Sequence, residues 1–129
     1  MVDLFILCVD RDGDANRRAA LDRLEARIGG SLEGGRAFLA EHAWQEIEVW
    51  VLAGHDLPAD WVWAEIRSEP NPKERYFEPF ARSRNVSDGP GGGRKALANA
   101  AARRIGRICR LCQEDFAALR DRVSAYIAG

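Results

Sequence analysis

The sequence is poor in several features that mark specialised classes of protein. Its 129 residues include three cysteines and two histidines, and the formal net charge is −1. Three cysteines, an odd number, argue against the disulfide framework of a small secreted protein. The near balance of charge excludes an overall basic field that would by itself indicate nucleic-acid binding, so an anionic partner would have to be bound locally.

Long apolar segments are missing as well. No apolar run approaches the roughly 18 residues that cross a bilayer, and no basic leader precedes a cleavable apolar segment. We therefore expect a cytoplasmic protein that does not interact with a membrane. A chain of this length, folded as one domain over residues 1–129, buries roughly two thirds of the surface of the unfolded chain. One complete core is expected.

The first half of the sequence predicts an α/β fold. The apolar run at residues 4–9 is typical of a strand buried on both faces, as in a parallel sheet. Apolar residues recur at helical spacing over residues 15–28, and the glycines at 29–30 end this helix. A second strand is expected at 36–42 and a helix at 43–53. This order implies a right-handed parallel crossover.

The second half predicts mainly helix. Residues 58–72 fit either a helix or an extended segment. Asn71 followed by Pro72 indicates a helix cap and first turn, so a short helix is expected from there toward residue 80. Apolar residues at helical spacing predict two final helices, at 95–111 and 114–127.

Residues 83–95 differ from the rest of this half. Four glycines and a proline predict a flexible loop, which could serve as a lid. A strip of basic side chains begins at the end of this loop with Arg94 and Lys95. Such a strip fits either phosphate contact or a solvated helix face.

Three aspartates follow the first strand at alternate positions: Asp10, Asp12 and Asp14. Ligands of open parallel sheets bind outside the carboxyl ends of the strands, where these side chains are expected. Mg²⁺ takes one or two carboxylates, keeps several waters and bridges to phosphate oxygens. The pattern therefore predicts a site for Mg²⁺ or Mn²⁺. The alternative is a solvated turn in which one aspartate caps the next helix.

Glu48 is out of place in the expected helix at 43–53. Its neighbours on the same helix face include Trp44 and Leu52, four residues away on either side. A buried carboxylate is costly unless a cation or a proton neutralises it. Glu48 is thus either a further acidic ligand or a general base, or it lies on a polar helix edge in water.

Two other groups fit a binding site or the core. The pair Cys109 and Cys112 lacks the further ligands of a closed zinc site and is more typical of core thiols. Four aromatic side chains could stack on bases, but such density is more often found in a core or a protein interface. They are Trp61, Trp63, Tyr76 and Phe77.

Four segments resemble a known family in chain order: LFILCVDRDGD, WQEIEVWVLAG, NPKERYFEPF and RICRLCQEDFAALRDRV. They are similar to the later portion of small TOPRIM-like proteins of unknown function, which often occur with mobile or defence-related genes. These are related to the TOPRIM domains of overcoming-lysogenization-defect nucleases and anticodon-nuclease-associated proteins. The similarity spans nearly the whole chain.

The resemblance implies a three-layer TOPRIM/Rossmann-like fold, with a small parallel sheet flanked by helices and a helical C-terminal portion. Asp10 and Asp12 match the family's Asp-x-Asp pair, and Glu48 before an aromatic residue matches its helical acidic position. The remaining matches are Pro72, Lys73, Cys112 and Phe116.

The activity implied by the resemblance is Mg²⁺-dependent hydrolysis of a phosphodiester, by this chain or by a complex of which it is a subunit, in a defence or mobile-element system. The cofactor would be Mg²⁺ or Mn²⁺, and the partner nucleic acid. The resemblance implies Asp10 and Asp12 for the metal and Glu48 and Lys73 for catalysis. The residue pattern adds Asp14 to the expected metal ligands, and the basic strip adds Arg94 and Lys95 for the substrate.

The sequence departs from the family at one point. TOPRIM enzymes carry an earlier strand that ends in a glutamate beside a glycine, whereas Glu33–Gly34 follows the Asp-x-Asp strand. The alternative function is therefore a non-catalytic interaction subunit, whose protein partner supplies the missing glutamate. An unpaired sheet edge also invites strand addition, so we expect a partner or a homodimer.

Overall fold

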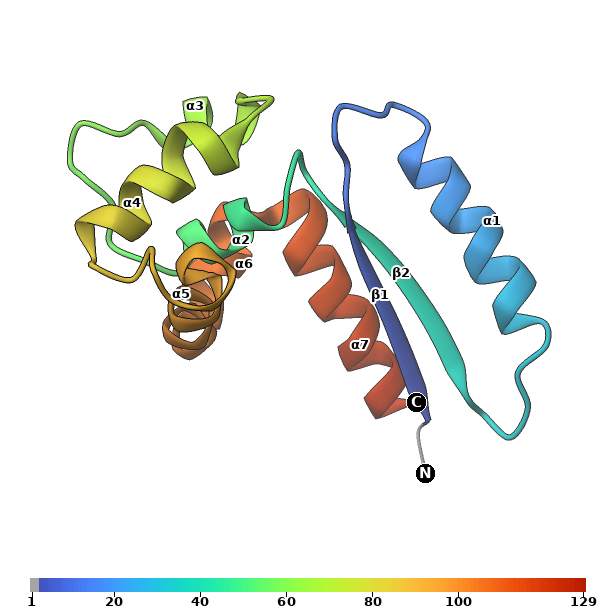
Figure 1. Ribbon diagram of the computed structural model, residues 1–129. Coiled ribbons are helices and arrows are strands. Elements are labelled where there is room, and N and C mark those ends of the chain that lie inside the picture. Colours follow the sequence, from blue (N-terminus) through green and yellow to red (C-terminus); the bar gives the residue numbers. More distant parts are fainter. Residues whose placement is uncertain (1–2) are drawn as a thin grey trace.

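The computed structural model describes residues 3–129 and has an α/β fold (Figure 1). Strand β1 (Leu4–Asp10) is followed by helix α1 (Arg17–Gly29) and strand β2 (Ala37–Ala43). The two strands are parallel, with Leu4 opposite Ala37 and Asp10 opposite Ala43. The predicted strand, helix and parallel strand are therefore confirmed, with ends shifted by only one or two residues.

Helices make up most of the remaining chain. The short 3-10 and π segments η1 to η4 connect or extend them. The elements are α2 (Glu48–Ala53), α3 (Trp63–Ser68), η1 (Lys73–Phe77), α4 (Glu78–Ser83), η2 (Pro90–Gly93), α5 (Arg94–Ala101), η3 (Ala102–Arg104), α6 (Ile105–Leu111), η4 (Gln113–Ala117) and α7 (Ala118–Ala128).

Helices α1 and α7 flank the two strands, and the other helices form a group beyond the strand ends (Figure 1). The last helix returns to the strands, where the Tyr126 hydroxyl lies 2.9 Å from the carbonyl oxygen of Asp3 and 2.8 Å from that of Gly35. An apolar core joins β2, α2, α3, η1, α4, α5, α6 and α7. Phe77, Leu52 and Ile66 are among its largest fully buried side chains.

The two outer edges of the sheet differ in how their backbone groups are hydrogen-bonded. At β2, the backbone N–H of Ala40 donates to Glu25 Oε1 at 2.6 Å, and its carbonyl oxygen accepts from Arg18 at 2.9 Å and Arg122 at 2.7 Å. Charged side chains from α1 and α7 thus occupy both backbone hydrogen-bonding groups of Ala40 at that edge.

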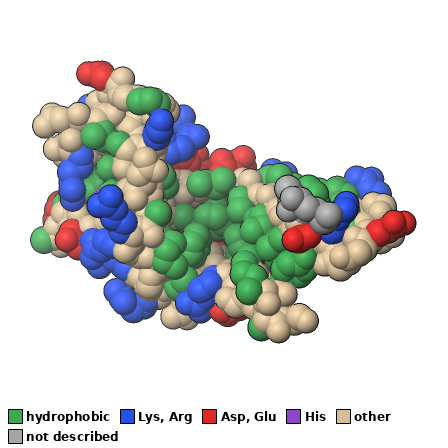
Figure 2. All heavy atoms as spheres, turned by 90° about the horizontal axis from the view of Figure 1, so that it is seen from below, with side chains coloured by type: hydrophobic (Ala, Val, Ile, Leu, Met, Phe, Trp, Pro, Cys, Tyr) green, Lys and Arg blue, Asp and Glu red, His purple; other side chains and the backbone are tan. Residues whose placement is uncertain are grey.

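Strand β1 pairs only with β2 within the part of the chain that the structure describes. Its other edge carries no strand, and Phe5 and Ile6 are 40% and 47% exposed. Phe5 and Ile6 point to opposite faces of the strand, and no residue of β1 is fully buried, so the expectation that β1 is buried on both faces is wrong. Apolar side chains gather across the middle of the face shown in Figure 2.

Helix α2 is shorter than the sequence predicts. It begins at Glu48 rather than at residue 43, because the connection from β2 turns through Gln45, whose φ is 66°. The backbone N–H of Trp44 donates to Asp115 Oδ2 at 2.7 Å, which holds the connection away from a helical path. Trp44 is therefore not a helical neighbour of Glu48.

The glycine-rich segment at 83–95 is partly helical. Gly91, Gly92 and Gly93 all have positive φ, and α5 starts directly after them. A Cβ on Gly93 would lie 2.9 Å from Cγ2 and from the carbonyl oxygen of Val86. The turn therefore needs glycine there and packs closely on the chain before it. The expected loop therefore spans residues 84–93, between α4 and α5.

The last two expected helices are interrupted. The first is divided into α5 and α6 by η3, and the second begins with a π-helical turn, η4, before α7. Cys109 and Cys112 are buried, which confirms them as core thiols. Trp61, Trp63 and Tyr76 pack against the core, and Phe77 lies within it.

Within residues 3–129, no helix is both long and apolar enough to cross a bilayer.

Candidate metal centre

The chain segments that leave β1 and β2 are joined by backbone hydrogen bonds. The N–H of Arg11 donates to the carbonyl oxygen of Ala43 at 3.0 Å, and that of Asp12 donates to Gln45 at 2.9 Å. The guanidinium of Arg11 also stacks 3.9 Å from the ring centre of Trp44. The carboxyl ends of the two parallel strands are therefore held together, as the fold requires for a shared site.

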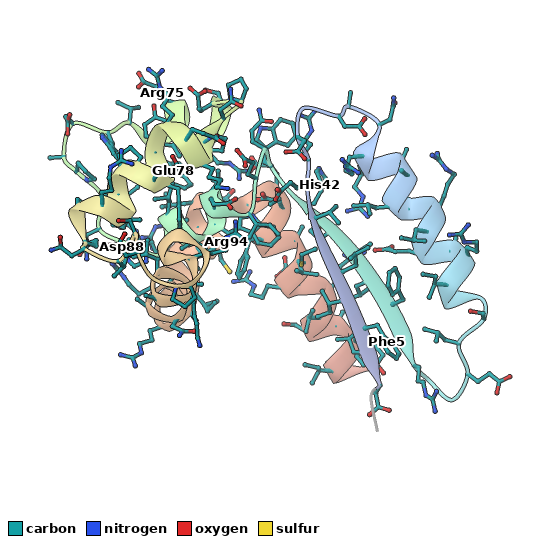
Figure 3. The ribbon with its side chains drawn as sticks, in the orientation of Figure 1. Phe5, His42, Arg75, Glu78, Asp88 and Arg94 are labelled. Carbon is teal, nitrogen blue, oxygen red and sulfur yellow. The ribbon has the colours of Figure 1, made fainter. Side chains whose placement is uncertain are left out.

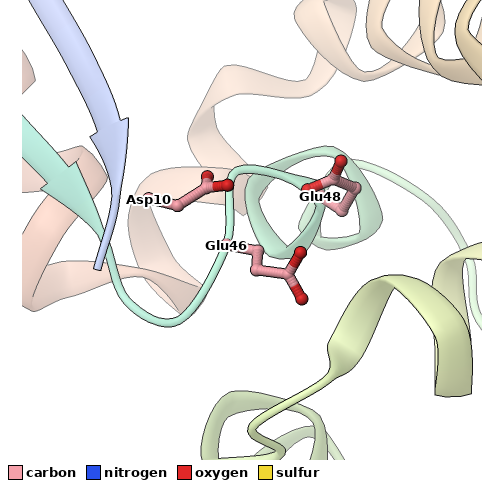
Figure 4. A group of neighbouring side chains, drawn as sticks. All are labelled: Asp10, Glu46 and Glu48. Atoms are coloured by element: carbon pink, nitrogen blue, oxygen red, sulfur yellow. The ribbon is translucent and has the colours of Figure 1, made fainter. Parts of the chain in front are cut away.

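Three carboxylates meet at these strand ends (Figure 4). Asp10, Glu46 and Glu48 each offer an oxygen within 4.8 Å of the oxygens of the other two. Asp10 comes from the end of β1, Glu46 from the connection after β2, and Glu48 from the first turn of α2. The N–H of Ile47 donates to Asp10 Oδ1 at 2.7 Å and so orients this carboxylate.

Glu48 is the most deeply buried of the three. Its side chain is only 4% exposed, and Oε1 accepts a hydrogen bond from Arg94 Nη2 at 2.6 Å. The second oxygen, Oε2, is buried and has no hydrogen-bond partner. Figure 4 shows the carboxylates of Glu48 and Asp10 turned toward each other. A buried carboxylate oxygen without a partner is costly, so this atom points to a ligand at the cluster.

Glu46 completes the cluster on the side of η1. Its Oε1 accepts from the backbone N–H of Lys73 at 3.4 Å, so the main chain at the predicted catalytic lysine contacts the cluster. Burial raises the pKa of the Glu46 carboxyl, and the nearby Glu48, Glu74 and Asp10 charges raise this pKa further. Glu46 therefore gains from a cation in the cluster.

The other two predicted aspartates lie outside this cluster. Asp12 is exposed in the turn after β1, where its φ is 50°. Asp14 accepts a hydrogen bond from the N–H of Asn16 at 2.8 Å, and it lies 4.0 Å from Arg17. Both positions fit the solvated turn before a helix. Of the three aspartates, the structure brings only Asp10 together with other metal-ligating groups.

The two basic residues predicted to bind substrate lie at the start of α5. Arg94 is on the side of that helix nearer to the strands (Figure 3) and contacts Glu48. Lys95 is exposed beside it.

Glu46 is not among the site residues that the sequence analysis predicts. The sequence pattern that could have identified Glu46 is its two-residue spacing from Glu48 beyond the second strand. This spacing repeats that of Asp10 and Asp12 at the end of the first strand.

The donor set fits a hard divalent cation. All three side chains offer carboxylate oxygens, the ligands preferred by Mg²⁺ and Mn²⁺. The cluster lies at the carboxyl ends of parallel strands, and one of its oxygens is buried without a partner. Both histidines are elsewhere: His42 contacts Glu41, and His55 contacts the Leu97 carbonyl.

Comparison of the chain with protein-family models, with curated proteins and with solved structures finds no match.

Proposed function

We propose that the protein binds Mg²⁺ or Mn²⁺ through Asp10, Glu46 and Glu48, and that it acts as a TOPRIM-like phosphodiester hydrolase or as a subunit of one. The unpartnered Oε2 of the buried Glu48, within a cluster of three carboxylates, carries this proposal. The parallel strands between α1 and α7 are compatible with a three-layer TOPRIM/Rossmann-like fold.

A bound divalent cation would neutralise charge on the phosphoryl oxygens and orient the attacking water. In this proposal Asp10, Glu46 and Glu48 hold the cation. Lys73, whose backbone N–H contacts Glu46, and the basic pair Arg94 and Lys95 at the start of α5 would bind the phosphate of the nucleic acid. The backbone contact of Asp10 with Ile47 keeps its carboxylate aimed at the cluster.

The test is calorimetric titration of Mg²⁺ and Mn²⁺ into the wild type and four variants. Asp10→Asn and Glu48→Gln should lose binding, whereas Asp12→Asn and Asp14→Asn should keep it. Circular dichroism checks that every variant is folded. Wild-type protein that binds neither ion would overturn the proposal.

Hydrolysis is tested separately on single-stranded and double-stranded DNA and RNA with Mg²⁺ or Mn²⁺. Activity should disappear in Asp10→Asn and persist in Asp14→Asn. Cleavage that survives in Asp10→Asn would come from another site or from a contaminating nuclease.

A second candidate function is a non-catalytic TOPRIM-like interaction subunit that binds a protein partner. The open edge of β1, with the exposed Phe5 and Ile6, favours it because an unpaired strand edge accepts another strand. Ion binding without cleavage of any nucleic acid would support this function. Light scattering then distinguishes a homodimer from a chain that requires a different partner.

A further inference from the structure

Arg94 places a positive charge at the carboxylate cluster. Its Nη2 donates to Glu48 Oε1 at 2.6 Å, and the Glu48 side chain is 4% exposed. No comparable contact to Asp10 or Glu46 from an arginine or lysine side chain occurs within residues 3–129. Arg94 is therefore the counter-ion that makes the buried charge of Glu48 tolerable.

The contact of Arg94 is incomplete compared with the other buried ion pair of the helical region. Arg67 donates hydrogen bonds to both carboxylate oxygens of Asp115, and the Arg67 side chain is 14% exposed. Arg94 donates to one oxygen of Glu48 only, and the Arg94 side chain is 49% exposed. The second Glu48 oxygen stays without a partner. Arg94 is thus held by fewer contacts and has solvent on one side.

The backbone beneath Arg94 is fixed. Gly93, with φ 96°, lies directly before it, and the space for a Cβ at Gly93 is taken by Val86 and Ala81. This close packing positions the first residue of α5. A movement of the guanidinium therefore needs only rotation about side-chain bonds of Arg94, which costs little in a half-exposed arginine.

We propose that Arg94 is an exchangeable counter-ion that couples cation binding to phosphate binding. This inference rests on the proposed metal site. Without the divalent cation Arg94 neutralises Glu48. When the cation binds at Asp10, Glu46 and Glu48, the guanidinium leaves Glu48 and turns to solvent, where its paired N–H groups bind a phosphate oxygen of the substrate.

The exchange explains two features together. Glu48 carries a negative charge that needs a counter-ion before the cation arrives, and Arg94 provides it. Once the cation takes over this charge, Arg94 is released with five N–H donors that match phosphate geometry. Linkage then requires that the cation strengthens phosphate binding, and that phosphate strengthens cation binding by the same factor.

The first test is calorimetric titration of Mg²⁺ into wild type, Arg94→Gln and Arg94→Lys. Arg94→Gln removes the competing charge, so the affinity for Mg²⁺ should rise about tenfold, within the range typical of coupled sites. Arg94→Lys keeps the charge and should stay within about threefold of wild type. Thermal unfolding and circular dichroism establish that the variants are folded.

The second test observes the arginine side chain itself, by nuclear magnetic resonance of the guanidinium nitrogens in wild-type protein. The Arg94 signals, assigned by their loss in Arg94→Lys, should shift or broaden when Mg²⁺ saturates the site. The Arg67 signals should stay unchanged, because Asp115 holds both arms of that guanidinium. This measurement needs no variant to bind metal.

The results separate the two proposals. Mg²⁺ binding to wild type with unchanged Arg94 signals overturns the exchange and leaves the metal site standing. The same holds if Arg94→Gln binds Mg²⁺ no more tightly than wild type. If neither wild type nor Arg94→Gln binds Mg²⁺, the metal site and the exchange both fail.

Discussion

Arg67 and Asp115 form a two-point ion pair across 48 residues of sequence, with Nη1 donating to Oδ2 at 3.0 Å and Nη2 to Oδ1 at 3.2 Å. Asp115 also accepts from the backbone N–H of Trp44 and from Trp50 Nε1. One buried carboxylate thus fixes α3, α2 and the connection after β2 at once. That connection carries Glu46, so the same contacts position the metal centre.

Replacing Asp115 with alanine should therefore be strongly destabilising. The variant leaves the Arg67 charge and two N–H donors without their acceptor, and the free energy of unfolding should fall by about 3–5 kcal/mol. Urea unfolding of wild type and Asp115→Ala measures this loss in the free energy of unfolding. The matched control is Glu114→Gln, because Glu114 is exposed and lies 3.4 Å from Arg67. Its change should stay within about 0.5 kcal/mol. Equal losses in both variants would contradict this account.

Two glycines should respond oppositely to alanine. A Cβ on Gly54 would lie 2.5 Å from the Cβ of Ala101, so Gly54→Ala should force α2 away from α5 and cost about 1–3 kcal/mol. Gly106 lies in α6, and no atom outside its own helix backbone and chain neighbours lies within 4 Å of the added carbon. Gly106→Ala should stabilise the protein by about 0.5–1 kcal/mol. Melting temperatures of the two variants provide the test, and a stabilised Gly54→Ala would refute the close packing.

Stability should decrease in mild acid because of the buried histidines. Burial lowers the pKa of His42 and His55, so below about pH 6.5 the unfolded chain takes up protons that the folded chain does not bind. The stabilisation is complete above that pH and is lost as the pH falls toward the lowered pKa values. Each histidine contributes at most about 1.4 kcal/mol per pH unit.

The measurement is urea unfolding between pH 7.5 and 5.5 for wild type and His55→Gln. The profile of the variant should be shallower than that of the wild type, because one buried titrating group is removed. The raised pKa of Glu46 acts in the opposite sense but is common to both proteins, so the difference between the profiles reports His55. Parallel profiles would exclude His55 as a contributor.

Cation affinity should also depend on pH through Glu46. Burial and neighbouring carboxylates raise the pKa of this group, so Glu46 takes up a proton at a higher pH than an ordinary glutamate and then cannot hold a cation. We expect Mn²⁺ affinity to fall as the pH is lowered toward 5. In Glu46→Gln the affinity should be weaker throughout and change less with pH. Calorimetry of both proteins at several pH values measures the Mn²⁺ affinity. If the affinity changes equally with pH in both proteins, Glu46 is not a ligand.

The elements that sequence reasoning located are those defined by local pattern. The apolar run of β1, the helical spacing of Leu21 and Leu24 in α1, and the glycines after it need no distant residue to be recognised. Asp12 and Asp14 also belong to a local structure, the turn before α1, and their alternate spacing alone could not distinguish a turn from a ligand set.

The features that escaped prediction depend on contacts distant in sequence. The start of α2 is set by Asp115, 71 residues after Trp44, and by the positive φ of Gln45. The role of Glu46 follows from the same connection, since its side chain reaches Asp10 only because the chain bends there. The burial of Glu48 was expected to need a cation, and Arg94, 46 residues later, is the cation present.

The two edges of the sheet differ in how readily they can accept another strand. At the edge of β2, Glu25, Arg18 and Arg122 bond to the backbone N–H and carbonyl oxygen of Ala40, whereas within residues 3–129 no strand pairs with the other edge of β1. Copies that pair through β1 would each use their one open edge, and the assembly would close at two chains. Charged side chains bonded to Ala40 would hinder strand addition at β2, so an assembly through both edges, which could grow without limit, is disfavoured.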